Sequence, residues 1–206
     1  MSPFAVLANG ADPRHEELAL GIAAELGCPP GTARARLESL AAGLPYAVAD
    51  PGRELDGVRA LVAGLRPVAG GPLLLPLVLD GGGDPVAVAV AAGAAAALAG
   101  LRIEPIGAAD GRLFLAHRVA LETPLVVDPE PPARLVDART LNADLSWRCA
   151  HETALCLLDA IVARAVRPND LSTALAASAL RLALPLEEGG RDEVAAAHAK
   201  LLARLN

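Results

Sequence analysis

The sequence has few aromatic residues and a single lysine. Phe, Trp and Tyr make up 2% of the 206 residues, so the stacking surfaces that bind single-stranded nucleic acid are scarce. The formal net charge of −6 provides no basic field for phosphate backbones or anionic lipids. We therefore predict no nucleic-acid partner. Positive charge is carried by arginine, and alanine, glycine and proline are abundant; this bias indicates a GC-rich, actinobacterial source.

Cysteine is also scarce. Cys28, Cys149 and Cys156 are an odd number without CxxC spacing, which argues against a disulfide framework and a cysteine zinc site. The sequence also lacks GK[ST] and HExxH motifs, so we expect no P-loop, metal or other cofactor. The first residues contain no basic stretch followed by an apolar run, and we expect a cytoplasmic protein.

One long apolar run is present, VAVAVAAGAAAALAGL at 86–101. It is shorter than the roughly 20 residues that a membrane span needs and consists mainly of alanine, so we predict a buried core helix and no membrane association. Asp84 is the expected N-cap and Pro85 the first helical residue, and the three glycines before them permit a sharp entry. The alternative is that this helix start contacts an anion.

Periodicity predicts the remaining elements. Helical spacing covers residues 13–27, 29–44, 54–65, 147–166, 170–185 and 191–205, and Asp144 or Ser146 is expected to cap the fourth of these. Strand patterns cover 102–108, 112–121 and 124–129, with an Asp-Gly hairpin signal at 110–111. The stretch 73–80 fits a strand or a loop, and 134–145 is expected to be a connector. About three antiparallel strands after a buried helix indicate an α+β fold.

Several sequence segments, in the order in which they follow along the chain, resemble the SirB1-like branch of the transglutaminase-like superfamily. The opening HEELALGIAAELG and ARARLESLAAGL is similar to the N-terminal helices of that family. GGGDPVAVAVAAGAAAALAGLRIEPIG, GRLFLAHRV and PLVVDPEPPARLVDA resemble its core, and WRCAHETALCLLDAIVARAV resembles its C-terminal helices. The resemblance implies a papain-like core of a buried helix and a small antiparallel sheet, with helical segments at both ends. We expect a core with its N-terminal helical hairpin at 1–140 and a C-terminal helical segment at 141–206.

Active members of that superfamily carry a Cys at the start of the core helix, a His on the next strand and an Asp on the following strand. Here Asp84 and Pro85 stand where the cysteine is expected, and Arg112 stands where the histidine is expected. Arg is always protonated near neutral pH and is no base. Only Asp128 matches the triad. His117 lies an odd number of residues from Arg112, so it is expected on the opposite face of the strand.

The candidate site residues leave alternatives open. Arg112, with His117 and Arg118 nearby, either forms an ion pair with Asp128 or lines a polar pocket for an acidic ligand group. Arg148, His151 and Glu152 share one helix face and either stabilise the helix start beside Trp147 or contribute to a ligand pocket. Cys149 and Cys156 are expected in the core, and His15 and His198 in solvent.

Two functions are consistent with the lost cysteine and histidine. The first is a pseudoenzyme that is neither a Cys-His-Asp transglutaminase nor a protease. It would act as a subunit of a heteromeric complex that binds a second protein or a small anionic or amine-bearing metabolite. The alternative is a subunit of a tailoring enzyme in secondary-metabolite biosynthesis, for example one that cyclises an amine to an aziridine with loss of sulfate. A cysteine hydrolase using Cys149 or Cys156 with His151 lacks a suitable geometry.

Overall fold

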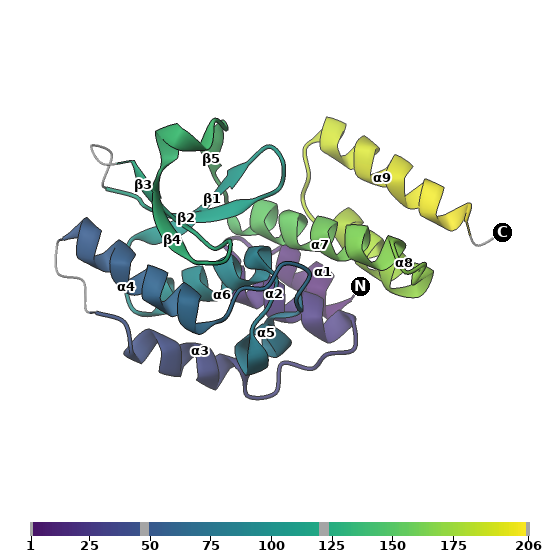
Figure 1. The fold of residues 1–206 in the computed structure, drawn as a ribbon. Coiled ribbons are helices and arrows are strands. Elements are labelled where there is room, and N and C mark those ends of the chain that lie inside the picture. Colours follow the sequence, from purple (N-terminus) through teal and green to yellow (C-terminus); the bar gives the residue numbers. More distant parts are fainter. Residues whose placement is uncertain (1, 46–49, 120–123, 205–206) are drawn as a thin grey trace.

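The computed structural model describes residues 2–45, 50–119 and 124–204. The described chain has an α+β fold, in which a five-stranded antiparallel sheet in the order β4-β3-β2-β1-β5 packs on helices. Helix α6 lies under β1 and β2, and α4 lies under β2, β3 and β4. In Figure 1 the sheet is at the upper left, and α9 lies over α8 at the far right.

The bounds of the elements are as follows. The helices are α1 (Pro3–Ala8), α2 (His15–Glu25), α3 (Ala33–Ala42), α4 (Pro51–Gly64), α5 (Leu75–Gly81), α6 (Pro85–Leu98), the 3-10 helix η1 (Ala138–Leu141), α7 (Ala150–Val166), α8 (Leu171–Leu182) and α9 (Glu188–Leu202). The strands are β1 (Ile103–Ala108), β2 (Leu113–His117), β3 (Leu125–Asp128), β4 (Arg134–Asp137) and β5 (Leu145–Trp147).

The two faces of the sheet have different environments. Leu113 and Leu115 of β2 face the main core, whereas Phe114 and Ala116 belong to a smaller cluster on the opposite face. Side chains of η1 and β5 cover this second cluster. All five residues of β2 are buried, because both faces of the strand are covered.

Helix α6 is the centre of the main core. Its residues are almost all buried from Pro85 to Ala96, and small alanine side chains let neighbouring helices and strands approach closely. The expected cap is confirmed: the Asp84 carboxylate accepts a hydrogen bond from the backbone N–H of Val86, and Pro85 is the first helical residue. The start of α6 could be predicted from the sequence because the N-cap and the first-turn proline are adjacent residues.

Two of the three glycines before α6 are required by close approach. Gly82 has a φ of 97°, and a Cβ there would lie 2.6 Å from the carbonyl oxygen of Arg66. A Cβ on Gly83 would lie 2.5 Å from Cγ2 of Val78. Gly83 also forms a parallel bridge with Pro67. The glycines therefore let α5 and the strand-like segment near Pro67 pack against the entry to α6.

Several sequence predictions were wrong in detail. The stretch 73–80 contains helix α5 rather than a strand or loop, and the connector 134–145 contains β4 and η1. Trp147 does not start the long helix. It ends β5, which pairs with β1, and α7 begins at Ala150 with Cys149 as its N-cap. Asp144 and Ser146 are therefore not its caps, and the sheet has five strands in the described chain.

The C-terminal helices pack on the rest of the chain. Helix α7 contacts α2, α6 and α8, and Leu157 and Leu158 of α7 belong to the main core cluster. Helix α9 packs on α8. A boundary at residues 140 and 141 stays a prediction. No helix in the described ranges is long and apolar enough to cross a membrane.

Candidate functional site

A small cavity lies at the N-terminus of α6. Its volume is about 100 Å³, and four segments line it: 69–70, 84–86, 112–114 and 128–130. The loop before α5, the start of α6, the start of β2 and the end of β3 therefore meet here. Among the sequence-predicted residues, Asp84, Arg112 and Asp128 border this cavity together. His117, Arg148, His151 and Glu152 do not line it.

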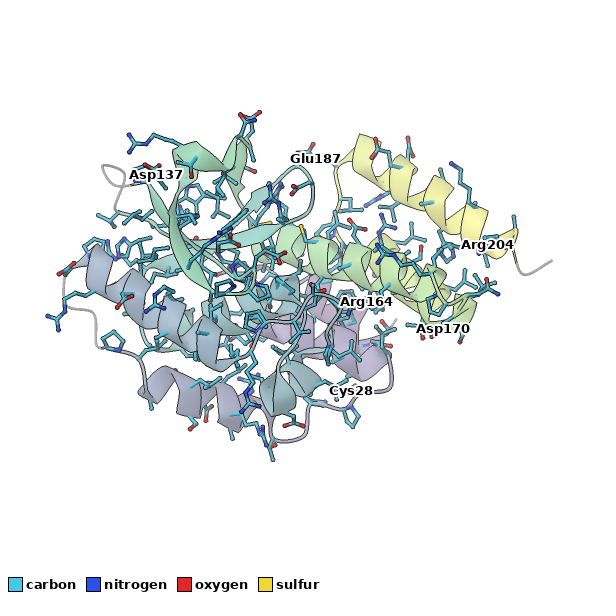
Figure 2. The ribbon with its side chains drawn as sticks, viewed as in Figure 1. Cys28, Asp137, Arg164, Asp170, Glu187 and Arg204 are labelled. Atoms are coloured by element: carbon cyan, nitrogen blue, oxygen red, sulfur yellow. The ribbon has the colours of Figure 1, made fainter. Side chains whose placement is uncertain are left out.

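Asp84 uses both carboxylate oxygens. Oδ1 caps α6 through the N–H of Val86 at 3.1 Å, and Oδ2 accepts from Nη2 of Arg164 in α7. Arg164 also donates from Nη1 to the carbonyl oxygen of Gly71. Figure 2 labels Arg164 on α7, among the side chains where the C-terminal helices meet the core. Asp84 is thus a cap and an ion-pair partner.

Asp128 pairs with an arginine other than the one expected. It is 2% exposed at the end of β3, and its Oδ2 accepts from Nη2 and Nε of Arg134 at 3.1 and 3.3 Å. Oδ1 accepts from the backbone N–H of Glu130 at 3.0 Å. Arg134 lies directly opposite Asp128 in the β3–β4 register. The predicted pair between Arg112 and Asp128 does not form, because Arg134 occupies the carboxylate.

Arg112 pairs locally instead. Its Nε donates to Oδ2 of Asp110 at 2.7 Å, and its guanidinium lies 5.4 Å from the ring centroid of Phe114. The backbone N–H and the guanidinium of Arg112 lower the pKa of Asp110. Neither Nη1 nor Nη2 of Arg112 has a hydrogen-bond partner among the described residues. Both terminal nitrogens of the side chain therefore keep their N–H donors free beside the cavity.

His117 is buried and paired on the other face of β2. Its Nδ1 accepts from the backbone N–H of Val119 at 3.1 Å, so Nε2 carries the hydrogen and donates to Oε2 of Glu54 in α4 at 3.2 Å. His117 has the same alternation as Leu113 and Leu115, as the odd spacing from Arg112 predicts. Both ring nitrogens are engaged away from the cavity, so His117 does not replace the missing base.

Arg148, His151 and Glu152 stabilise the start of α7. The carboxylate of Glu152 accepts from the backbone N–H of Cys149 at 2.9 Å, and His151 Nε2 donates to the carbonyl oxygen of Ala8 at 2.8 Å. The Arg148 side chain lies so close to Gly107 of β1 that a Cβ there would meet its Nε at 2.3 Å. These contacts join α7 to β1 and α1.

The cysteines lie apart from the cavity. Cys149 is exposed, so its predicted core position is wrong, and Cys156 is partly buried on α7. Burial raises the pKa of the Cys156 thiol, which keeps it protonated and weakly nucleophilic near neutral pH. Cys28 follows α2, and Figure 2 shows it on the opposite side of the molecule from Asp137 of β4. None of the three reaches the start of α6.

Three residues at or next to the cavity were not predicted. Arg164 and Arg134 neutralise the two aspartates, and Glu130 borders the cavity. Arg134 had a usable signal, because it follows Asp128 by only six residues and the two prolines between them indicate a turn. Arg164 had none, since it lies 80 residues from Asp84.

No group of three or more His, Cys, Asp and Glu side chains in the described ranges is arranged to hold a metal ion. No protein-family model, no curated protein and no solved structure matches this chain. The transglutaminase-like resemblance therefore rests on the sequence phrases alone.

Proposed function

We propose that this chain is a catalytically degenerate transglutaminase-like protein that acts as a binding subunit, with the cavity at the start of α6 as its ligand site. The observation that carries the proposal is the occupation of the helix start by Asp84. Its carboxylate is committed to the N-cap and to Arg164. The cysteine expected at this place in active members is absent, and a carboxylate held by two hydrogen-bond partners is not free to attack a substrate.

The charge of the cavity supports a small polar ligand. Asp84, Asp128 and Glu130 place three carboxylates at its border, and Arg112 adds a guanidinium. Pockets for drug-sized ligands enclose about 300–1,000 Å³, whereas this cavity encloses about 100 Å³. A small metabolite, or the polar end of a larger one, fits that size. We also propose that the chain binds a second protein subunit.

The proposal predicts no thiol chemistry. The purified protein is incubated with glutamine peptides and a primary amine, and with ester and amide substrates, while ammonia release and product formation are followed. We expect no turnover and no effect of alkylation by iodoacetamide. Turnover that alkylation abolishes would overturn the proposal.

Binding is tested by native and denaturing mass spectrometry of the protein purified from its source organism. A retained small molecule or a stoichiometric partner supports a binding subunit. Asp128→Asn tests the site, because its amide cannot form the ion pair with Arg134 and alters the cavity wall. Arg139→Met is the matched control, since Arg139 pairs with Asp137 outside the cavity. Equal retention by both variants would place the ligand elsewhere.

One observation favours the tailoring-enzyme alternative. Closing an amine onto carbon with loss of sulfate requires a carboxylate near the amine to take its proton and a cation near the departing sulfate. Glu130 and Arg112 supply both kinds of group at one cavity. The test incubates the protein with an amino sulfate ester and measures inorganic sulfate. Sulfate release by the wild type that disappears in Arg112→Met and Glu130→Gln would favour the tailoring enzyme.

A further inference from the structure

The charges around the cavity are nearly all paired. Asp84 pairs with Arg164, Asp128 with Arg134, and Asp110 with Arg112. The Glu130 carboxylate is half-buried and has no hydrogen bond or ion pair among the described residues. Of the described residues that line the cavity, Glu130 therefore carries the one uncompensated charge.

Arg112 has unused hydrogen-bonding capacity at the same place. Only Nε contacts Asp110, so the terminal nitrogens Nη1 and Nη2 remain free to donate. Two parallel donors on a guanidinium match the geometry of a carboxylate. The guanidinium also makes a cation–π contact with the ring of Phe114, another residue that lines the cavity.

The strand pair β2–β3 brings these two residues to the same end of the sheet. Strand β2 pairs with β3 through Leu115 with Val127 and Ala116 with Val126. Arg112 comes directly before β2 and Glu130 comes two residues after the end of β3, so in this antiparallel pair both lie beyond the same end of the strands. Both side chains line the cavity, yet they form no ion pair with each other. One carboxylate without a partner and two unused donor nitrogens therefore border the same cavity.

We infer that the cavity binds the zwitterionic head of an α-amino acid. The ligand ammonium pairs with the Glu130 carboxylate, and the ligand carboxylate accepts from Nη1 and Nη2 of Arg112. This inference rests on the proposed binding function and names its ligand class. A lone cation would pair with Glu130 but would leave the free donors of Arg112 unused. A lone anion would accept from those donors but would face the uncompensated negative charge of Glu130. Only a ligand with both charges uses both groups.

The test compares three probes on the intact protein by ¹H–¹⁵N NMR titration at low ionic strength. Glycine carries both charges, ethylammonium carries only the positive one and acetate only the negative one. We expect shifts at the amides of Gly70, Phe114 and Glu130, and at Nε–H of Arg112. The Kd for glycine should be at least tenfold lower than for either single-charge probe. A probe with the same head on a longer chain, Nε-acetyl-lysine, should also bind if the head alone is recognised.

The variants should change selectivity in opposite directions. Glu130→Gln should weaken glycine binding about tenfold and strengthen acetate binding, because the negative neighbour is gone. Arg112→Met should weaken glycine binding and strengthen ethylammonium binding, and its aliphatic chain still covers Phe114. Arg139→Met and Glu193→Gln are the controls and should leave all three affinities unchanged.

The outcomes separate the two proposals. If ethylammonium or acetate shifts the cavity amides and binds as tightly as glycine, the zwitterion inference is wrong and the binding function stands. If none of the probes shifts the cavity amides, the zwitterion inference is wrong, and the binding function is decided separately by what the native protein retains in the mass-spectrometry experiment. If glycine binds more tightly but Glu130→Gln and Arg112→Met bind it unchanged, the assignment of these two residues is overturned.

Discussion

The guanidinium of Arg164 in α7 donates to the carboxylate of Asp84 at the start of α6 and to the carbonyl oxygen of Gly71. The three residues come from three segments of the chain, and Arg164 lies 93 residues from Gly71. The C-terminal helices therefore supply a side chain that fixes the loop and the helix start at the cavity. The geometry of the candidate site depends on how α7 packs.

The first prediction concerns this ion pair. Arg164→Met keeps the aliphatic stem but removes both hydrogen bonds, which are charge-assisted and about 1.5–3 kcal/mol each when buried. Since Arg164 is 36% exposed, we expect a loss of about 1–2 kcal/mol in the free energy of unfolding. Urea denaturation measures it. Arg167→Met, an exposed position one turn further along, should change stability by less than about 0.5 kcal/mol, and equal losses would contradict the role of Arg164.

The second prediction separates the two tasks of Asp84. Asparagine is a good N-cap but carries no charge, so Asp84→Asn should lose only the attraction to Arg164. Asp84→Ala should lose the cap as well, at an additional cost of about 1 kcal/mol. The free energies of unfolding should rank wild type, Asn, then Ala. A double-mutant cycle between Asp84→Asn and Arg164→Met should show non-additivity, and strictly additive losses would mean that the pair is not coupled.

The local signals in the sequence explain what could be predicted. Asp84 and Pro85 are adjacent and predict the start of α6, and the apolar run that follows predicts that this helix is buried. The hairpin at 110–111 and the alternation of β2 also depend only on neighbours in sequence. These features are short-range, so a single sequence contains them.

The features that were missed depend on distant partners. Strand β5 is only three residues long, and its partner β1 lies about 40 residues earlier, so Trp147 could be assigned to the helix that follows. The Glu54 partner of His117 is 63 residues away. Spacing rules do not reach that far, and the pairing of Asp128 with Arg134 rather than Arg112 is decided by sheet register.

The third prediction tests whether His117 is structural. His117→Leu removes the hydrogen bond to the Glu54 carboxylate in a buried setting, and we expect a loss of about 1.5–3 kcal/mol in the free energy of unfolding. Glycine binding at the cavity should stay unchanged, because neither ring nitrogen faces it. Arg112→Met should give the opposite pattern, with weaker glycine binding and little change in stability. If the His117→Leu variant is folded but no longer binds glycine, His117 contributes to the ligand site and this prediction is wrong.

The fourth prediction concerns pH and His15, which was expected in solvent. It is partly buried, and its Nδ1 has no hydrogen-bond partner in the described ranges. Burial lowers the pKa of His15 below its usual 6.5, with Glu104 opposing the shift. A lowered pKa means that the unfolded chain binds the proton more readily. Stability is therefore full above about pH 6.5 and is lost as the pH falls through the folded pKa.

His15→Gln should flatten this loss between pH 6.5 and 5, measured as the difference in unfolding free energy from wild type. The same comparison at pH 8 is the control, because there His15 is neutral in both states and only packing differs. Carboxylates such as Glu17, whose pKa is lowered by the hydrogen bond from Arg14, titrate at lower pH and cancel in the difference. An unchanged difference across this range would contradict the shift.

The last prediction uses two neighbouring glycines as a matched pair. Gly83 has no room for a methyl group, since a Cβ would lie 2.5 Å from Cγ2 of Val78 and 2.7 Å from the carbonyl oxygen of Pro72. Gly81 is exposed at the end of α5, and a Cβ added there would meet nothing within 4 Å among the described residues. Gly83→Ala should destabilise by about 1–3 kcal/mol because the loop and α5 must move apart. Gly81→Ala should be neutral or stabilise by up to about 1 kcal/mol, because alanine loses less backbone entropy on folding. Thermal unfolding of the two variants decides the point: shifts of the same sign and size would mean that the entry to α6 is not packed as tightly as Val78 and Pro72 indicate.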